Sequence, residues 1–184
     1  MSFFGIFLIL LILIGVWLVW TYNRFIRHKN NVREAWSGID VQLKRRHNLI
    51  PNVIETVKGY LGHEQGTLDS LTRLRTGNAD GESVSKIAQH ESNLSKAIGG
   101  ILAVAEGYPD LKANAGFLDL QHKLHETEEQ VQLARRYYNG TARNWNILVE
   151  SFPSNLIANM FRFELAEYFE IELATERALP KVDF

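Results

Sequence analysis

The strongest constraint on this chain is an apolar run near its N-terminus. Residues 3–20 contain no charged side chain and are rich in Leu, Ile, Val and Phe. Continued to Tyr22 as a helix, the run is roughly 30 Å long, which is the thickness of the hydrocarbon core of a bilayer. Trp17, Trp20 and Tyr22 supply the aromatic residues typical of a membrane interface. We therefore predict a single transmembrane anchor, residues 1–22, in the cell inner membrane.

A cleaved signal peptide is the alternative interpretation of this run. Such a peptide needs Lys or Arg before its apolar part and a small-x-small site after it, and this sequence offers neither before Tyr22. Basic residues instead follow the run, at Arg24, Arg27, Lys29 and Arg33. The positive-inside rule then predicts that residues 23–184 form a cytoplasmic domain, with these four side chains at the lipid headgroups.

Charge is distributed unevenly along the chain, although the net charge is only −1. Residues 23–49 carry a surplus of five positive charges, so residues 50–184 carry a net charge of −6. Because the basic segment adjoins the anchor and the remainder is acidic, membrane lipids are the expected partner and nucleic acid is not. The chain has no cysteine, which excludes disulfides and thiolate metal sites.

Residues 30–60 show the periodicity of a helix packed along other helices. Apolar residues recur at alternating steps of four and three, and Arg46 occupies the one polar position on that face. The face consists of Val32, Trp36, Ile39, Leu43, Arg46, Ile50, Val53, Val57 and Tyr60. Pro51 lies within the pattern, where it predicts a kink, with a break near Ile50 as the alternative.

The same helix is expected to continue to about residue 74, weakened by Gly62 and Gly66. The polar, glycine-rich residues 76–83 predict a loop. A second helix is then predicted over residues 83–106, with Ser92 on its exposed face. Its inward residues are Val84, Ile87, Leu94, Ile98, Ile101, Leu102 and Ala105.

A third helix of more than thirty residues is predicted to begin after Asp110 or Asn114, either of which can cap it. Its inward residues are Phe117, Leu120, Leu124, Val131, Tyr138, Trp145 and Leu148. Pro153 ends it, and a fourth helix follows, capped by Ser154 or Asn155 and acidic on its outer face. The apolar face of this helix consists of Leu156, Ile157, Met160, Phe161, Leu165, Tyr168, Phe169 and Leu173. The predicted fold is all-α: an N-terminal transmembrane helix followed by an elongated antiparallel four-helix bundle.

Four segments of the chain closely resemble the LemA family. They are Asp40 to Glu64 (DVQLKRRHNLIPNVIETVKGYLGHE), Glu106 to Asn114 (EGYPDLKAN), Ala134 to Asn139 (ARRYYN) and Phe152 to Ala158 (FPSNLIA). The resemblance extends over nearly the whole chain. It implies a single membrane anchor followed by an antiparallel helical bundle, and it implies little about chemistry.

Polar residues on or near the packed faces are the candidate site. Glu128 takes a heptad position between Leu124 and Val131. We predict a structural polar seam, because buried charges are tolerated when paired and a polar residue at such a position fixes the register of the helices. The seam consists of Arg45, Arg46, His47, Glu128, Arg135 and Asn139. The alternative is a binding or catalytic cleft built from Arg46, His47, Glu128 and Arg135.

A metal site at His122 and His125 is a weaker hypothesis. The two residues are three positions apart, with Glu126 and Glu129 nearby, but the zinc-protease helix uses a spacing of four and no third ligand is obvious. Solvated helix surface is the expected role, and we predict no metal or cofactor.

No nucleophile elbow, phosphate loop or paired-carboxylate motif occurs in the sequence. We therefore predict a membrane-anchored scaffold or interaction protein, not an enzyme, that forms a homo-oligomer and contacts other membrane proteins. A metal-dependent enzyme and a ligand sensor, both using the cleft around Arg46, are the alternatives. A scaffold would expose apolar stripes, an enzyme would have convergent ionisable groups in a pocket, and a sensor would have a cavity between helices.

Overall fold

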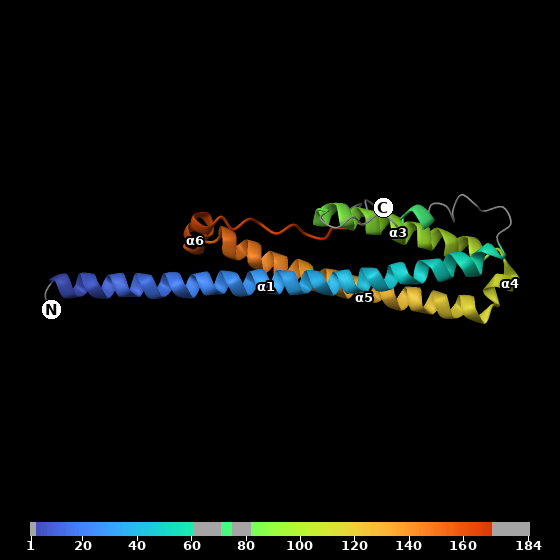
Figure 1. Cartoon of the computed structure of the whole chain (residues 1–184), viewed down its shortest axis with the longest axis horizontal. Coiled ribbons are helices and arrows are strands. Elements are labelled where there is room, and N and C mark those ends of the chain that lie inside the picture. Colours follow the sequence, from blue (N-terminus) through green and yellow to red (C-terminus); the bar gives the residue numbers. More distant parts are fainter. Residues whose placement is uncertain (1–2, 61–70, 75–81, 171–184) are drawn as a thin grey trace, which may run out of the picture. The chain divides into compact units, whose positions relative to one another are not determined.

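The computed structural model describes residues 3–60, 71–74 and 82–170, and these residues form helices without a strand (Figure 1). Residues 71–74 are helical, and the other helices are α1 (Phe3–Lys58), α3 (Val84–Ala105), α4 (Pro109–Lys112), α5 (Ala115–Glu150) and α6 (Ser154–Phe161). The prediction of an all-helical fold with an N-terminal apolar helix is confirmed.

The chain divides into two compact units, and α1 and α5 contribute to both. One unit, here the proximal unit, comprises residues 1–39 and 134–167. The other, here the distal unit, comprises residues 40–133 and 168–184.

The core of the distal unit is formed by apolar faces of α1, α3 and α5. Its buried members include Ile50 and Val57 of α1, Leu94 and Ile101 of α3, and Leu124 of α5. All seven residues predicted to face inward on α5 are buried. Burial of a Leu or Ile side chain contributes about 1.5–3 kcal/mol, so this shared core is the main source of stability for the unit.

The relative directions of α1, α3 and α5 differ from the predicted antiparallel arrangement. Arg46 of α1 contacts Glu128 of α5, whereas Tyr60, just past α1, contacts Asn114 at the start of α5, so these two helices are antiparallel. Ser95 of α3 donates to Glu128 of α5, and further along α3 Leu102 lines one groove together with Leu118, which precedes Glu128 on α5, so α3 is also antiparallel to α5. Helices α1 and α3 are therefore parallel (Figure 1). The connection between them has 25 residues, 59–83, which is long enough to return along the unit.

Helix α1 continues through Pro51, as the kink hypothesis requires, and ends at Lys58. Gly59 follows, and the N–H of Tyr60 donates to the carbonyl of Val57 at 3.0 Å, a tight turn of the kind that ends helices. The predicted continuation through Gly62 and Gly66 lies outside the described residues, as does most of the predicted loop at 76–83.

Capping side chains set the starts of α3 and α5. The hydroxyl oxygen of Ser83 accepts from the N–H of Lys86, and the side-chain oxygen of Asn114 accepts from the N–H of Phe117 at 3.0 Å. Helix α5 then runs for 36 residues. The predictions for these two helices are confirmed, except that Ser92 is buried and not exposed.

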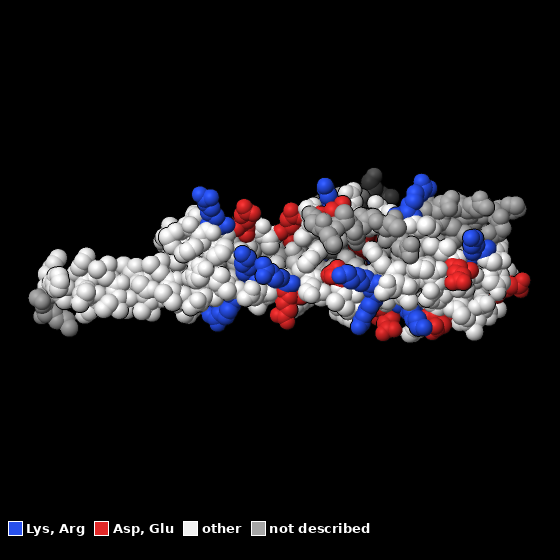
Figure 2. Space-filling model, viewed as in Figure 1, with Lys and Arg blue, Asp and Glu red and all other residues white. Residues whose placement is uncertain are grey.

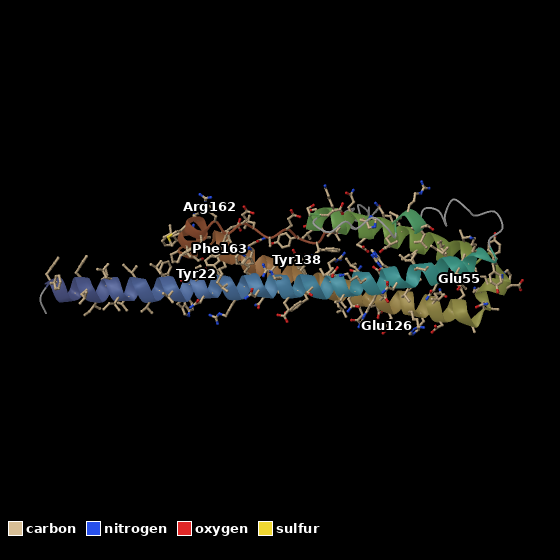
Figure 3. The ribbon with its side chains drawn as sticks, viewed as in Figure 1. Tyr22, Glu55, Glu126, Tyr138, Arg162 and Phe163 are labelled. Carbon is tan, nitrogen blue, oxygen red and sulfur yellow. The ribbon has the colours of Figure 1, made fainter. Side chains whose placement is uncertain are left out.

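Aromatic residues form the core of the proximal unit. Phe25 of α1 stacks on Phe163 with ring centroids 4.8 Å apart and meets the edge of Trp145 of α5 at 5.6 Å. Ile157 and Ala158 of α6 complete this cluster. Figure 3 shows Tyr22 of α1 and Phe163 on the facing sides of their segments.

The fourth helix is much shorter than predicted. Helix α6 ends at Phe161, where Arg162 adopts a left-handed conformation (φ 54°), and residues 163–170 are not helical. Most of its predicted apolar face is exposed, and Leu173 lies outside the described residues. Ser154 does not cap it either, because the Ser154 hydroxyl donates to the carbonyl of Leu148, with the carbonyl of Ser151 at 2.9 Å.

Side chains of α5 hold residues 163–170 in this non-helical form. The carbonyls of Glu164 and Glu167 accept from Trp145 Nε1 and the Tyr138 hydroxyl, each at 2.8 Å. Asn146 exchanges two hydrogen bonds with the backbone of Ala166, at 2.8 and 3.0 Å. These bonds satisfy backbone groups that a helix would have paired internally, which explains why the helical pattern of this segment is not realised.

The N-terminal part of α1 provides the one helix, among those described, that is long and apolar enough to cross a membrane. None of its most apolar eighteen-residue window is buried within the chain. Figure 2 shows this part of α1 without a Lys, Arg, Asp or Glu on the face in view.

Candidate functional site

A buried arginine organises the polar side chains of the distal unit. Arg46 follows Ile39 and Leu43 and precedes Ile50 on the inward face of α1, so the helix directs it into the core. Its side chain is only 1% exposed. A charge at this depth persists only with ionic or hydrogen-bonding partners.

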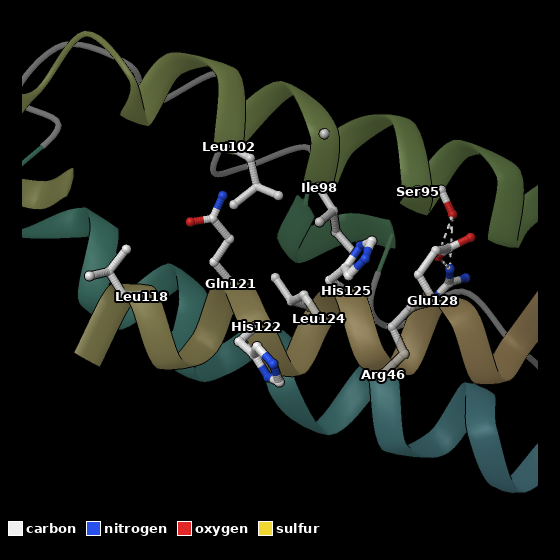
Figure 4. A pocket seen from close by; sticks show the side chains of 11 residues that line it. Arg46, Ser95, Ile98, Leu102, Leu118, Gln121, His122, Leu124, His125 and Glu128 are labelled. Carbon is white, nitrogen blue, oxygen red and sulfur yellow. Dashed lines mark hydrogen bonds and ion pairs between the residues drawn. The ribbon is translucent and has the colours of Figure 1, made fainter. Parts of the chain in front are cut away.

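Two other helices supply those partners. Arg46 Nη1 donates to Glu128 Oε2 of α5 at 2.7 Å and to Ser95 Oγ of α3 at 2.8 Å, as the dashed lines of Figure 4 show. Arg46 Nη2 donates to the carboxylate of Glu91, and the backbone carbonyl of that residue is 3.3 Å away. His47 Nε2 donates to the second oxygen of the same carboxylate at 2.8 Å. These five residues form one network, which we call the Arg46 network.

Glu91 is the most deeply buried acid in the network, with 0% of its side chain exposed. Burial by itself raises the pKa of this carboxyl group. The hydrogen bond from His47 and the positive charge of Arg46 more than offset that effect, so the pKa of Glu91 lies below its ordinary value of 4.5. Glu91 is therefore ionised at neutral pH and neutralises Arg46.

Glu91 and Ser95 were missed in the sequence analysis, although a signal for Glu91 was present. The inward residues Ile87, Leu94 and Ile98 of α3 follow steps of three and four, and Glu91 fills the remaining position of that series. This is the rule that identified Glu128 on α5. Applied to charged as well as apolar residues, it predicts both acids.

The structure brings only part of the predicted polar seam together. Arg46, His47 and Glu128 belong to the network, whereas Arg45 is exposed on the outer face of α1. Arg135 and Asn139 are half-buried on the part of α5 that belongs to the proximal unit.

A groove of about 600 Å³ opens between α3 and α5 beside the network (Figure 4). Leu102, Leu118 and Leu124 contribute to its largely apolar wall, and Gly99 adds no side chain. Arg46 and Glu128 lie at one end, where they already bond each other. The groove therefore offers apolar surface next to the ion pair of Arg46 and Glu128.

His122 and His125 are exposed residues at the rim of this groove. His125 lies 3.5 Å from Glu129, one turn further along α5. In the described parts of the chain no three His, Asp or Glu residues are grouped so that they could hold a metal ion. The Ser95 hydroxyl accepts from Arg46 Nη1 and donates to Glu128 Oε2 at 3.4 Å, so it is engaged within the network.

The four predicted headgroup residues are exposed at the end of the apolar run. Arg24, Arg27, Lys29 and Arg33 all lie on the solvent side of α1. The guanidinium of Arg24 sits 5.8 Å from the centre of the Trp20 ring, a cation–π contact of the kind found at membrane interfaces.

The sequence profile of the LemA family matches residues 35–184, which include the whole Arg46 network. The chain belongs to the LemA family. It is 28% identical over 182 residues to Protein LemA of Metamycoplasma hominis, with 94% of this chain and 83% of that protein aligned.

This LemA-family chain is also similar to proteins described as magnetosome proteins. It is 22% identical over 179 residues to Magnetosome protein MamQ 2 of Paramagnetospirillum magneticum, covering 66% of that protein's length. It is 18% identical over 178 residues to Magnetosome protein MamQ of Magnetospirillum gryphiswaldense, covering 65% of it. In both cases 83% of this chain is aligned.

Proposed function

We propose that this LemA-family protein is a non-enzymatic, membrane-anchored scaffold that assembles laterally with copies of itself. The observation that carries the proposal is an apolar stripe on α5 that the fold leaves uncovered. Leu133, Tyr137 and Ile147 are each about half exposed or more. With Gly140 and Asn144 they follow steps of four and three, the spacing of a face that packs along another helix.

This stripe lies opposite the buried face of the same helix. Leu133 follows the buried Val131 by two positions, and Ile147 follows the buried Trp145 in the same way. Two positions correspond to about 200° around a helix, so the stripe points away from the core. Exposed apolar side chains aligned on one face of a helix are typical of a protein interface. A second copy anchored in the same membrane is the expected partner, because its stripe lies at the same distance from the membrane surface.

The Arg46 network supports a structural role for the polar residues. Both terminal nitrogens of Arg46 and both carboxylate oxygens of Glu91 are bonded within the network. A catalytic or sensing site would keep such groups available for a substrate or ligand. A network of this kind fixes the register of α1, α3 and α5, which a scaffold needs in order to present a constant surface.

Two charges on the stripe are expected to abolish assembly. In mild detergent, the full-length protein should form a particle of several subunits, whereas Leu133→Glu combined with Tyr137→Glu should yield monomers, because assembly would bury unpaired carboxylates. Light scattering coupled to size-exclusion chromatography measures the mass. A monomeric parent protein would contradict the proposal.

The matched control places the same two charges elsewhere. Gln89 and Asn93 are exposed on α3 and are also four residues apart, so Gln89→Glu with Asn93→Glu adds equal charge without touching the stripe. This variant should assemble as the parent does. Equal loss of assembly in both variants would assign the effect to net charge and not to the stripe.

The proposal places the helical units on the cytoplasmic side of the inner membrane, because basic residues follow the apolar run. A cysteine at the exposed position Asn93 is expected to resist a membrane-impermeant thiol reagent in intact cells and to react once the cells are permeabilised. The chain has no native cysteine, so the label reports one site. Ser92→Cys, at a buried position, controls for accessibility. Labelling of Asn93→Cys in intact cells would reverse the orientation.

A further inference from the structure

Helix α6 packs against the end of the apolar run of α1. The ring centroids of Phe161 and Tyr22 are 4.8 Å apart, and Trp17 packs against the cluster that contains Ile157. Trp17 lies within the apolar run, and Arg24 is the first charged residue after it. The two are seven residues apart, or about 10 Å along the helix. Helix α6 therefore lies at the level where the hydrocarbon core of a bilayer gives way to the headgroups.

The face of α6 that points away from α1 is apolar and uncovered. Ser154, Ile157 and Ala158 are buried, and Leu156 and Met160, four residues apart, are exposed on one side. Phe152, just before the helix, is 80% exposed. Residues 152–161 carry no charged side chain. Phe and Leu side chains with this exposure are unfavourable in water and favourable at the boundary between headgroups and acyl chains.

We propose that α6 is an interfacial helix that lies in the bilayer surface beside the anchor, so that the proximal unit contacts lipid at two places. Phe152, Leu156 and Met160 enter the acyl boundary. Like the side chains of the run in α1, these three are apolar and exposed. Arg24 and Arg162, exposed near the two ends of this contact, face anionic headgroups. Figure 3 shows Arg162 pointing away from Tyr22 on the outer side of α6.

This arrangement goes beyond lateral assembly, because it fixes the height and tilt of the proximal unit. A helix tethered only by a single span can tilt and rotate about that span. A second contact, displaced from the axis of α1 by the width of a helix, removes that freedom.

Single cysteines test the contact in the full-length protein. Leu156→Cys and Met160→Cys, each carrying an environment-sensitive fluorophore, are reconstituted in vesicles of mixed zwitterionic and anionic phospholipid. Asn30→Cys is the control, since it is exposed on α1 about 15 Å beyond Trp20. Nitroxide-labelled lipids with the nitroxide near the headgroup should quench both α6 labels, and aqueous iodide should quench the Asn30 label.

The remaining outcomes overturn the proposal. Quenching of the α6 labels by iodide at the level of the Asn30 label would show that the helix faces water. Shielding from both quenchers, lost when the protein-to-lipid ratio is lowered, would show that a second copy covers α6. Because the lipid contact is measured at low protein-to-lipid ratio, it can succeed or fail independently of assembly through α5.

Discussion

Replacing Arg46 by alanine is expected to lower the free energy of unfolding by about 3–5 kcal/mol, because it removes one member of a buried ion pair. Glu91 would remain buried with His47 as its partner in the network. The Arg46 network would lose the guanidinium group, which joins α1, α3 and α5. Denaturant titration of the full-length protein in mild detergent, followed by circular dichroism, measures the loss.

Three further variants separate charge pairing from packing. Arg46→Met with Glu91→Leu removes both charges and fills the space with apolar atoms, so it is expected to recover most of the lost stability. Glu128→Ala is expected to cost about 1 kcal/mol or less, since the Glu128 side chain is 36% exposed and water can replace it, and Glu128→Leu should remain folded. An Arg46→Ala protein as stable as the parent would show that the pair does not form in solution.

The same network makes stability depend on pH. The pKa of Glu91 is lower in the folded protein than its ordinary value of 4.5, so its contribution is fully present above that value and is lost as pH falls through the lower folded value. Glu91→Gln should flatten the fall of unfolding free energy in this acidic range. Unchanged pH dependence in that variant would assign the acid sensitivity to other carboxylates.

Trp145→Ala is expected to destabilise the proximal unit by about 3–5 kcal/mol, because it removes a large buried side chain and leaves a cavity. The indole is 5% exposed and contacts the rings of Phe25 and Phe163. It also donates the hydrogen bond to Glu164 that helps to hold residues 163–170. Hydrogen exchange should therefore accelerate in these residues in addition to the global loss measured by denaturation.

Two controls isolate the contributions of Trp145. Trp145→Phe keeps an aromatic ring but leaves the Glu164 carbonyl without its donor, so it should cost about 1–3 kcal/mol. Arg143→Ala, at an exposed residue of the same helix outside the stripe, should change the unfolding free energy by no more than about 0.5 kcal/mol. If Trp145→Ala and Arg143→Ala have equal effects, the aromatic cluster is not a core.

Periodicity predicted the helices well because burial on one helical face leaves a local trace in the sequence. The inward faces of α1 and α5 and the burial of Arg46 follow from steps of three and four alone. The direction of α3 leaves no such trace, since a helix has the same periodicity whether it runs parallel or antiparallel to its neighbour. It depends on the length of the connection between α1 and α3. A first helix that continued to about residue 74, as predicted, would leave only a short loop before the second helix, whereas α1 ends at Lys58.

Residues 163–170 could not be predicted from their own sequence. Their apolar spacing is compatible with a helix, but their conformation is set by Tyr138, Trp145 and Asn146, which lie about twenty to thirty residues earlier on α5. Hydrogen bonds from distant side chains override a local preference that is worth only fractions of a kcal/mol per residue. Glu91, by contrast, was predictable and was missed because only apolar residues were followed along α3.

The position of Arg46 also has a mechanical consequence for α1. A slide of α1 by one turn would move it 5.4 Å past α3 and α5 and would place Leu43 or Ile50 opposite the carboxylates. The buried carboxylate of Glu91 and the half-buried carboxylate of Glu128 would then face an aliphatic side chain while the guanidinium entered the apolar core. The Arg46 network thus fixes the axial position of α1 within the distal unit. A displacement along the axis of α1 would therefore be transmitted to α3 and α5.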